Sequence, residues 1–405
     1  MKKNAKLIWF FLLVISMGLH AQNWSAQNSG VTADLDDVFA LSAAEAWVCG
    51  DNGVLLHTTD GGMNWNSVAL TGADLQGIAF KDANLGIVVG DGGTVFQTTN
   101  GGQSWTLQTS PTASQLRGVA WGSGDVVWAA GEGGAAIRSV DNGVNWSSLV
   151  TGSGSRIRSI DAIGSDLAWI VGNGALLRHT QNAGASWVSQ SPGGDDIQDV
   201  QFLDSQVGYI SRSSTPSLLF TDNGGTTWSS RSTGIVEDLN GLFFINNELG
   251  WATSEGHNIY QTTDGGLNWT LQFNGTAFGE ITEVHFASPE RGWAVGDAGV
   301  IYVFESATGI EDVTSIHPEG IELDQNYPNP FNPSTTIRYR VLKAGPVQLN
   351  IFNAVGQIVQ SINVATAPSG EYTYTFEAEY LPSGVYFYEL KQNGSALMRK
   401  MLLMK

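Results

Sequence analysis

Carboxylates and arginines recur at regular intervals along this chain of 405 residues, and these are the side chains with which it could do chemistry. One set falls in a series of short turns and reads Asp51, Asp91, Glu132, Asn173, Arg212, Glu255 and Asp297. Glycoside hydrolysis needs two carboxyl groups about 5 to 10 Å apart. Acidic residues are too numerous here for their presence to mark such a pair. The sequence therefore predicts no catalytic residue.

The acidic members of this set allow two interpretations. Acidic residues followed by glycine are favourable in tight turns, which would make these residues structural. A ring of carboxylates on one surface would instead attract a cationic partner. Both interpretations stay open at this point.

A second set lies shortly upstream of the turns and reads Asp36, Gln76, Arg117, Arg158, Gln198, Asn240 and Thr282. Arg117 and Arg158 come from successive units of the chain, and we expect Arg156 and Arg212 close by. Guanidinium groups bind carboxylates through paired hydrogen bonds, so this group could hold an acidic side chain or the C-terminus of a peptide. The alternative is that the arginines only neutralise neighbouring Asp and Glu side chains.

The segments that must position these residues form a repeat. Seven tryptophans recur at intervals of 40 or 41 residues, namely Trp24, Trp65, Trp105, Trp146, Trp187, Trp228 and Trp269. Six of them end the motif S/T-x-D/N-x-G-x-x-W, the Asp-box, in which the Asp or Asn is Asp60, Asn100, Asp141, Asn182, Asn223 or Asp264. That side chain accepts hydrogen bonds from nearby main-chain amides, and glycine adopts a positive φ without strain. We therefore interpret these six residues as structural.

Each unit contains three strand-like segments ahead of its Trp strand, as at 75–80, 85–90 and 94–98 in the second unit. Four strands in about 40 residues are typical of a propeller blade. The last unit lacks a Trp strand, and the first Trp strand, around Trp24, lacks a blade. We therefore predict that the segment around Trp24 pairs with residues 300–304. The fold class that follows is all-β, with a seven-bladed β-propeller.

Composition narrows the range of partners. The formal net charge is −19, and residues 22–309 hold 9 Lys and Arg against 29 Asp and Glu, whereas residues 310–405 hold 7 against 9. The resulting charges of −20 and −2 argue against nucleic acid and anionic membranes and favour cationic partners. The six histidines are scattered and the single cysteine, Cys49, lies in an apolar segment, so we expect a buried thiol and no metal site. No cofactor-binding motif is present, and we predict no cofactor.

The N-terminus has the features of a signal peptide over residues 1–21. Lys2, Lys3 and Lys6 precede an apolar run over 7–19, and Ala21 supplies a small residue at the expected cleavage point. No other segment approaches the length of a transmembrane helix. We therefore expect an exported chain without a transmembrane span.

Two parts of the chain resemble known families. The pattern at 86–105, Gly-Asp-x-Gly followed by Thr-Thr-Asn-Gly-Gly-x-x-Trp, recurs over about 24–306 and resembles the propellers of the photosystem II stability and assembly factor family. The segments 323–339, 349–359 and 381–390 resemble the type A sorting domain of type IX secretion cargo. The second resemblance implies passage across the outer membrane.

These features predict a signal peptide over 1–21, a propeller over 22–306, a linker over 307–318 and a sorting domain over 319–405, the last folded as a small β-sandwich. The predicted function is that of a non-catalytic binding or scaffold module, secreted or held at the cell surface after passing through the periplasm. Its partners would be the type IX machinery and an unidentified protein, peptide or glycan. An extracellular glycoside hydrolase of the Asp-box propeller type is the alternative.

Overall fold

The computed structural model describes residues 24–405 except 216, 232–233, 276–278, 307–320, 324–325, 327–328, 330, 354–357, 393–394 and 404–405. The predicted signal peptide and linker therefore lie outside the described residues. The chain divides into two compact units, Met1–Thr308 and Gly309–Lys405.

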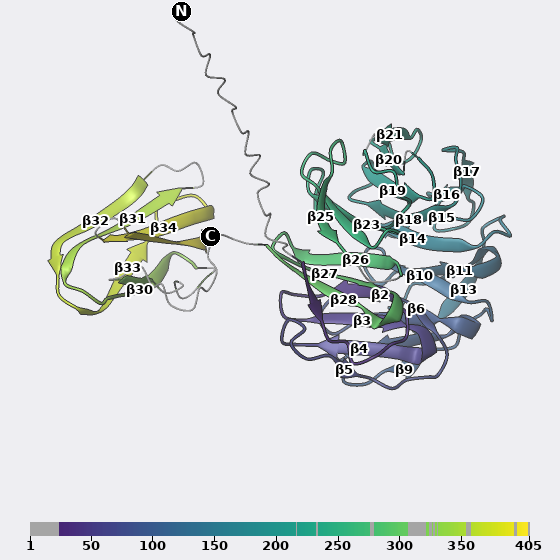
Figure 1. Cartoon of the computed structure of the whole chain (residues 1–405), viewed down its shortest axis with the longest axis horizontal. Helices are drawn as coiled ribbons and strands as arrows, with labels where there is room; N and C mark the ends of the chain where they lie inside the picture. The colour runs from purple at the N-terminus through teal and green to yellow at the C-terminus, as the bar shows by residue number, and fades with distance from the viewer. Residues whose placement is uncertain are drawn as a thin grey trace, which may run out of the picture. The chain divides into compact units, whose positions relative to one another are not determined.

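Seven four-stranded antiparallel sheets, the blades, make up the first unit (Figure 1). From the inner to the outer strand, blades 1 to 4 are β2 (Leu35–Ala40), β3 (Ala46–Gly50), β4 (Val54–Thr58), β5 (Asn66–Ser67); β6 (Leu75–Phe80), β7 (Gly86–Gly90), β8 (Val95–Thr98), β9 (Thr106–Leu107); β10 (Leu116–Trp121), β11 (Val127–Gly131), β12 (Ala135–Ser139), β13 (Trp146–Val150); and β14 (Ile157–Ile163), β15 (Leu167–Gly172), β16 (Leu176–Thr180), β17 (Val188–Gln190). Blades 5 to 7 are β18 (Ile197–Phe202), β19 (Gly208–Arg212), β20 (Leu218–Thr221), β21 (Ser229–Arg231); β22 (Leu239–Phe244), β23 (Gly250–Ser254), β24 (Asn258–Thr262), β25 (Thr270–Asn274); and β26 (Ile281–Ser288), β27 (Arg291–Gly296), β28 (Ile301–Glu305), β1 (Trp24–Gln27).

Burial falls from the second strand of a blade to its outer strand. Strands β3 and β7 are buried at every position, whereas β5 and β9 are exposed throughout. Both faces of a middle strand contact neighbouring blades, and such a strand is a continuous apolar run in the sequence. Cys49, within β3, is fully buried, as its apolar surroundings predict.

The N-terminal strand closes the ring. Strand β1 pairs antiparallel with β28, with Trp24 opposite Phe304, which confirms the predicted closure and the seven-bladed fold. The Gln27 side chain reinforces this seam because its Oε1 accepts hydrogen bonds from the indoles of Trp65 (3.1 Å) in blade 1 and Trp293 (3.2 Å) in blade 7. The first and last blades are therefore joined by hydrogen bonds as well as by packing.

The repeated S/T-x-D/N-x-G-x-x-W turn has the same hydrogen bonds in all six copies. In the first copy, the main-chain amide of Gly62 donates to Thr58 Oγ1 (2.8 Å), and the amide of Asn64 donates to Asp60 Oδ1 (2.9 Å). The amide of Gly61 donates to the carbonyl oxygen of Ala44 in the turn between the first two strands of the blade (2.8 Å). The motif thus ties two turns of one blade together.

Aromatic side chains fill the spaces between neighbouring blades. One buried position in the second strand is occupied by Trp47, Ile87, Trp128, Trp169, Tyr209, Trp251 and Trp293. The outer-strand tryptophan of the following blade packs edge-on against this position, as Trp105 does against Trp47 at 5.5 Å and Trp187 against Trp128 at 6.3 Å. At this position a blade therefore covers an aromatic side chain of the blade before it, except at Ile87 of blade 2.

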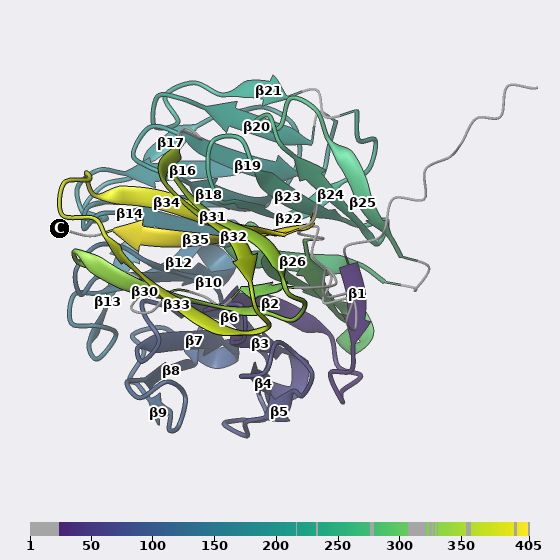
Figure 2. The same ribbon diagram turned by 90° about the vertical axis from the view of Figure 1, so that its left-hand side faces the viewer.

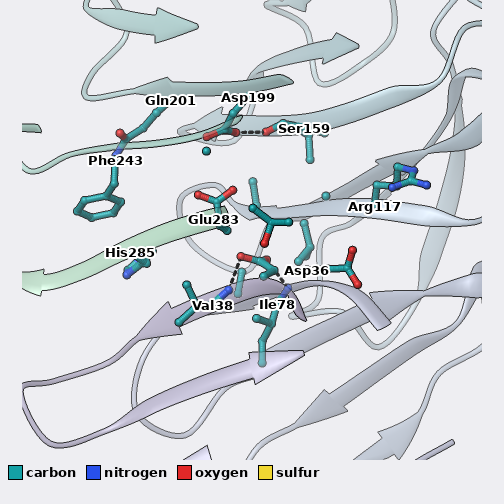
Figure 3. A pocket seen from close by; sticks show the side chains of 18 of the residues that line it. Asp36, Val38, Ile78, Arg117, Ser159, Asp199, Gln201, Phe243, Glu283 and His285 are labelled. Atoms are coloured by element: carbon teal, nitrogen blue, oxygen red, sulfur yellow. Dashed lines mark hydrogen bonds between the residues drawn. The ribbon is translucent and has the colours of Figure 1, made fainter. Parts of the chain in front are cut away.

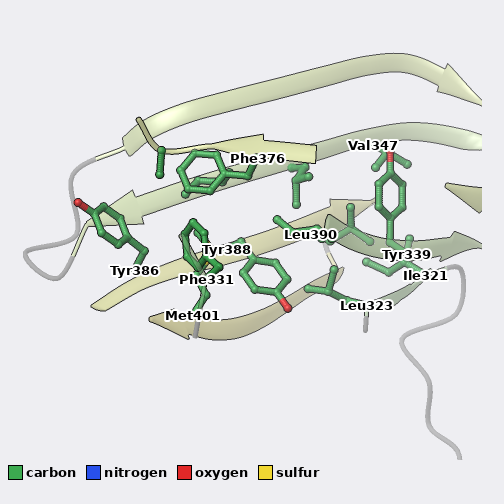
Figure 4. Close-up of a cluster of buried hydrophobic side chains, with 14 of the residues drawn as sticks. Ile321, Leu323, Phe331, Tyr339, Val347, Phe376, Tyr386, Tyr388, Leu390 and Met401 are labelled. Carbon is green, nitrogen blue, oxygen red and sulfur yellow. The ribbon is translucent and has the colours of Figure 1, made fainter. Parts of the chain in front are cut away.

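The second unit is a small β-sandwich, as predicted. One sheet has the order β29 (Ile321–Leu323), β30 (Ser334–Val341), β33 (Gly370–Glu377), and the other has the order β32 (Ile358–Ala367), β31 (Gly345–Asn353), β34 (Gly384–Gln392), β35 (Ser395–Leu403). Figure 2 shows the strands of the second sheet gathered in one layer. Phe331, Phe376, Tyr388 and Met401 belong to a core cluster of this unit, and each is at most 2% exposed (Figure 4).

We expect Thr58→Val to destabilise the propeller by about 1 to 3 kcal/mol, because the buried amide of Gly62 loses its acceptor while the side-chain volume is preserved. Thr58 is fully buried, whereas Thr106 in β9 is exposed. The control Thr106→Val should change the unfolding free energy by less than about 0.5 kcal/mol. Urea denaturation of the two variants measures both values, and equal losses would contradict the structural role of the turn.

Candidate functional site

The seven inner strands surround a cavity of about 510 Å³ on the axis of the propeller (Figure 3). The second position of every inner strand supplies polar lining, and the third and fifth positions add to it in blades 1, 4, 5 and 7. The second positions are Asp36, Gln76, Arg117, Arg158, Gln198, Asn240 and Thr282, and the third and fifth positions add Asp37, Ser159, Asp161, Asp199, Gln201, Glu283 and His285. Side chains alternate between the two faces of a strand, so the third and fifth positions point into the cavity together.

A chain of hydrogen bonds and ion pairs links the second positions of blades 1 to 3 and continues to blade 4. Gln76 Nε2 donates to Asp36 (3.2 Å), and Arg117 Nη1 donates to Gln76 Oε1 (2.9 Å). Arg117 Nε then binds Glu132 Oε1 at 3.1 Å, and Arg156 Nε binds the same oxygen at 2.5 Å. We call these five residues the polar arc. It brings Arg117, Arg156 and Glu132, three residues predicted from the sequence, into direct contact.

The remaining arginines lie in different surroundings. Arg158 lines the cavity and donates from Nε to Asn173 Oδ1 at 2.7 Å, with Asp196 at 3.4 Å from its Nη2. Arg212 is only 6% exposed, and its Nη1 donates to the carbonyl oxygen of Gly193. Two of the four arginines therefore line the cavity, one is paired beside it, and one is buried in blade 5.

Arg212 also differs from its predicted alignment. In each blade the first residue of the turn between the second and third strands donates its main-chain amide to the residue that precedes the inner strand, as Asp51 does to Asp34 and Asp91 to Asp74. In blade 5 this donor is Ser213, and Arg212 pairs with Ile197 in the register of Gly50 and Gly90. The equivalent residue is therefore Ser213, because the turn that follows Arg212 is longer than in the other blades.

The acidic residues of the predicted rim occupy these turns. Asp51, Asp91, Glu132 and Asp297 each begin a single turn of 3-10 helix, and Glu255 begins a similar turn in blade 6. Burial and then the carboxylates of Asp74, Asp34 and Asp91 raise the pKa of Asp51. The rim is therefore acidic enough for its carboxylates to affect one another's protonation.

Four carboxylates inside the cavity were missed by the sequence reasoning, namely Asp37, Asp161, Asp199 and Glu283. Asp37 accepts the amides of Val38 (2.7 Å) and of Ile78 in the next blade (2.8 Å). Asp161 binds Ala162 and, in the next blade, Phe202 in the same way. Their signal in the sequence is a polar residue at the third or fifth position of an otherwise apolar inner strand.

Asp199 repeats this arrangement between blades 5 and 6. It accepts the amide of Leu242 (3.1 Å) and the hydroxyl of Ser159 (2.7 Å, Figure 3). On the seam between blades 7 and 1, His285 Nδ1 accepts the amide of Ala40 at 3.2 Å. Polar side chains in the cavity thus join inner strands of neighbouring blades.

Burial shifts the protonation of these groups strongly. It raises the pKa of Asp37 and of Asp161 to about 7, and burial together with Asp51 raises the pKa of Asp36 to about 8. Burial, Asp199 and Asp37 hold the pKa of Glu283 well above its usual range. Carboxyl groups with raised pKa values in a cavity are typical of functional sites. Here Asp37 and Asp161 accept main-chain hydrogen bonds from the next blade, which accounts for their burial structurally.

Among the residues that the structure describes, no group of three or more His, Cys, Asp and Glu side chains is placed to hold a metal ion. The cavity wall instead offers amide, guanidinium, hydroxyl and carboxyl groups. Such a lining can bind polar main-chain or hydroxyl groups through several hydrogen bonds at once.

Two family models match parts of the chain. Residues 190–308 match the Photosynthesis system II assembly factor YCF48 model, and residues 325–404 match the Secretion system C-terminal sorting domain model. Both resemblances predicted from the sequence are thereby confirmed. Export by type IX secretion, to the cell surface or beyond it, follows from the second match.

Solved structures support the fold. A structure titled "YCF48 bound to D1 peptide" is 21% identical, covers 72% of this chain and 98% of its own, and has a TM-score of 0.62. YCF48 from Cyanidioschyzon merolae is 19% identical with a TM-score of 0.58, over 70% of this chain and 99% of its own. A structure of U3-55K, 8% identical, reaches a TM-score of 0.60 over 70% of this chain and 98% of its own. No curated protein matches significantly.

In the part of the chain that the structure describes, no helix is long and apolar enough to cross a membrane.

The raised pKa values predict that the propeller loses stability as the pH rises from about 6.5 to about 8.5. In the unfolded chain the carboxyl groups titrate near pH 4, so over this interval only the folded state releases protons. For each proton that the folded state holds and the unfolded state has lost, the free energy of unfolding falls by about 1.4 kcal/mol per pH unit. For a domain of this size we expect the melting temperature to fall by about 2 to 4 °C per pH unit, as measured by calorimetry.

Two variants control this measurement. Asp161→Asn removes one titrating group and should flatten the dependence. Asp141→Asn should leave it unchanged, because hydrogen bonds from the main chain and side chain of Asn145 lower the pKa of Asp141. The lower limit of the interval is about pH 6.5 because burial lowers the pKa of His285 to about 3. Below that limit the unfolded state binds a proton at this histidine that the folded state does not, so His285 makes stability rise with pH. A flat or rising melting temperature would contradict the prediction.

Proposed function

We propose that this chain, a YCF48-like propeller with a type IX sorting domain, acts outside the cell as a non-catalytic binding module. The end of the cavity lined by the second positions of the inner strands, which we call the channel mouth, would hold an extended peptide of a partner protein. The observation that carries the proposal is the polar arc, which runs without interruption from Asp36 to Arg156. Amide and guanidinium groups arranged along a line match the alternating donors and acceptors of a peptide main chain.

Arg117 and Arg158 have the capacity to bind a ligand as well as their neighbours. Arg117 uses Nε and Nη1 in the polar arc, and its side chain is 24% exposed at the cavity. Arg158 is 30% exposed and holds Asp196 only at 3.4 Å. A carboxylate of a peptide that approached these two guanidinium groups would form charge-assisted hydrogen bonds with donors that are already fixed in place.

The cavity favours binding over glycoside hydrolysis. A hydrolase needs a carboxylic acid and a second carboxylate that are free to exchange protons with substrate and water. Asp37, Asp161 and Asp199 instead accept main-chain amides from two blades each. Reorienting any of them would break these hydrogen bonds between blades, so their structural role accounts for their presence.

The solved relatives favour a peptide over a glycan as the ligand. One YCF48 structure is titled as bound to a D1 peptide, and its propeller covers most of this chain's first unit at the level of fold. A propeller of this architecture can therefore hold a peptide. The partner of this chain would be another protein met at or beyond the cell surface.

Export would proceed in two steps, with the segment 1–21 as signal peptide into the periplasm and residues 319–405 as the sorting domain for the outer membrane. The sorting-domain match over 325–404 supports the second step. The charge of −20 on residues 22–309 keeps the exported propeller soluble and favours cationic peptides away from the arginines.

We expect Arg117→Ala and Arg158→Ala each to weaken peptide binding by about 1.5 to 3 kcal/mol, because each removes charge-assisted hydrogen bonds to the ligand. Their effect on the melting temperature should be small, since both side chains are partly exposed. The ligand comes from screening the protein against peptide and glycan arrays, and affinities come from calorimetric titration. Lys81→Ala removes a cation that is paired with Asp125 and does not line the cavity, and it serves as the matched control.

Normal peptide binding by both arginine variants would contradict the assignment of Arg117 and Arg158 to the binding site. Selective capture of glycans with release of reducing sugar would instead favour the hydrolase alternative.

Removal of residues 319–405 should abolish appearance of the protein outside the cell while the propeller keeps its melting temperature, because the two units are separate compact bodies. Cell fractionation with an antibody against the propeller measures the distribution. Normal export of the truncated chain would show that the C-terminal unit does not direct secretion.

A further inference from the structure

The C-terminal β-sandwich has four strand edges, and three of them carry features that block strand addition. Strand β29 has only three residues. Strand β33 carries Glu371 and Glu377 at its two ends. Strand β35 carries Arg399 and Lys400, and Leu403 at its end forms a bridge with Phe331. Short length, charge and coverage are the usual means by which proteins protect exposed sheet edges.

Strand β32 has none of these protections. It runs for ten residues, Ile358–Ala367, without a charged residue, a proline or a glycine. Its only strand neighbour in the described residues is β31, and the register between them is unbroken from Val347 opposite Val364 to Ile351 opposite Gln360. The pairing is irregular on both sides of this segment, between Gly345 and Val347 and between Ile351 and Phe352. The edge is therefore regular over residues 360–364, where no charge, proline or glycine opposes pairing.

The side chains of β32 are also arranged so that a second strand could pair with it. Ile362 and Val364 pack against the sandwich core, while Ser361, Asn363 and Ala365 are exposed and small. About half of the main-chain amide and carbonyl groups of an edge strand point away from its neighbour. Over the five regular residues 360–364 the edge extends for about 17 Å. A strand added along this segment would gain a short ladder of hydrogen bonds and meet no bulky or charged side chain.

We propose that β32 is a docking edge at which the export machinery adds an extended, uncharged strand to the four-stranded sheet of the sorting domain. The proposal rests on the proposed function, because it assumes that this unit directs export. A neutral edge is complementary to a neutral strand. Charged flanks would be tolerated, but a charge in the middle of the added strand would be placed against the uncharged edge without a partner.

The net charges of the two units also favour the export machinery over a second copy of the chain as the occupant of this edge. Residues 310–405 carry a charge of −2, whereas residues 22–309 carry −20. Pairing two copies through β32 would bring two strongly negative propellers into one particle, and their repulsion opposes the dimer. The sorting domain, which an external strand would contact, is nearly neutral. The position of β32 within the matched segment 325–404 is consistent with a role in sorting.

The test places lysines on the exposed face of the edge in the full-length chain. The variant Ser361→Lys/Asn363→Lys copies the natural protection of edge strands. The matched control, Thr373→Lys/Thr375→Lys, adds the same charge at exposed positions of β33. We expect the edge variant to reach the medium or cell surface at least tenfold less than the unmodified chain, with an unchanged melting temperature, and we expect the control to be exported normally.

Equal export of the edge variant and the unmodified chain would overturn the proposal, as would an equal loss in edge variant and control. If the double variant is unstable, Asn363→Lys alone must still reduce export while its melting temperature is unchanged. Sedimentation of the unmodified protein identifies the occupant, because a dimer that the edge lysines dissociate would show that a second copy covers β32. The truncation of residues 319–405 separates the two claims, since loss of export there with normal export of the edge variant refutes only the docking edge.

Discussion

Burial of aromatic side chains between neighbouring blades is the constraint on which the rest of the structure depends. Each second-strand position such as Trp47 or Trp251 is fully buried only because the next blade covers it. Trp251 stacks on Phe286 of blade 7 at 3.5 Å, and Trp24 packs edge-on against Phe286 at 5.8 Å. A blade that lacks its neighbour would expose this surface to water, so the ring is stable only when it closes. Strand β1 meets that requirement at the last blade.

Closure determines what the centre of the molecule can contain. The inner strands converge on the axis, so their inward side chains lie around a common cavity. Polar side chains that are buried there need hydrogen-bond partners within the protein. Asp37, Asp161 and Asp199 resolve this by accepting amides across blade boundaries, at the cost of carboxyl groups with raised pKa values. The mouth is less constrained, and its polar groups are partly exposed. The stabilising groups and the candidate binding groups are therefore separated by depth in one channel.

The sequence predicted the blade number and the closing strand because the regular Trp interval and the turn motif are local signals that every unit repeats. The same periodicity failed at Arg212, where a longer turn in blade 5 shifts the count by one residue. The role of Asp37 was not predictable, because its partner Ile78 lies 41 residues away and only the closed ring brings them together. Arg117 and Arg158 line the cavity, and their pairing with Glu132 and Asn173 could be seen only in the structure.

The central claim is that the channel mouth, and not the face formed by the S/T-x-D/N-x-G turns, binds a peptide. Hydrogen-exchange mass spectrometry of the protein with and without a peptide from the array screen tests it most directly. The account predicts slower exchange in the segments 74–77, 115–118 and 156–159, which lead into β6, β10 and β14, with no change at 60–65. Protection confined to 60–65 and the equivalent turns of other blades, with unchanged exchange at the mouth, would contradict it.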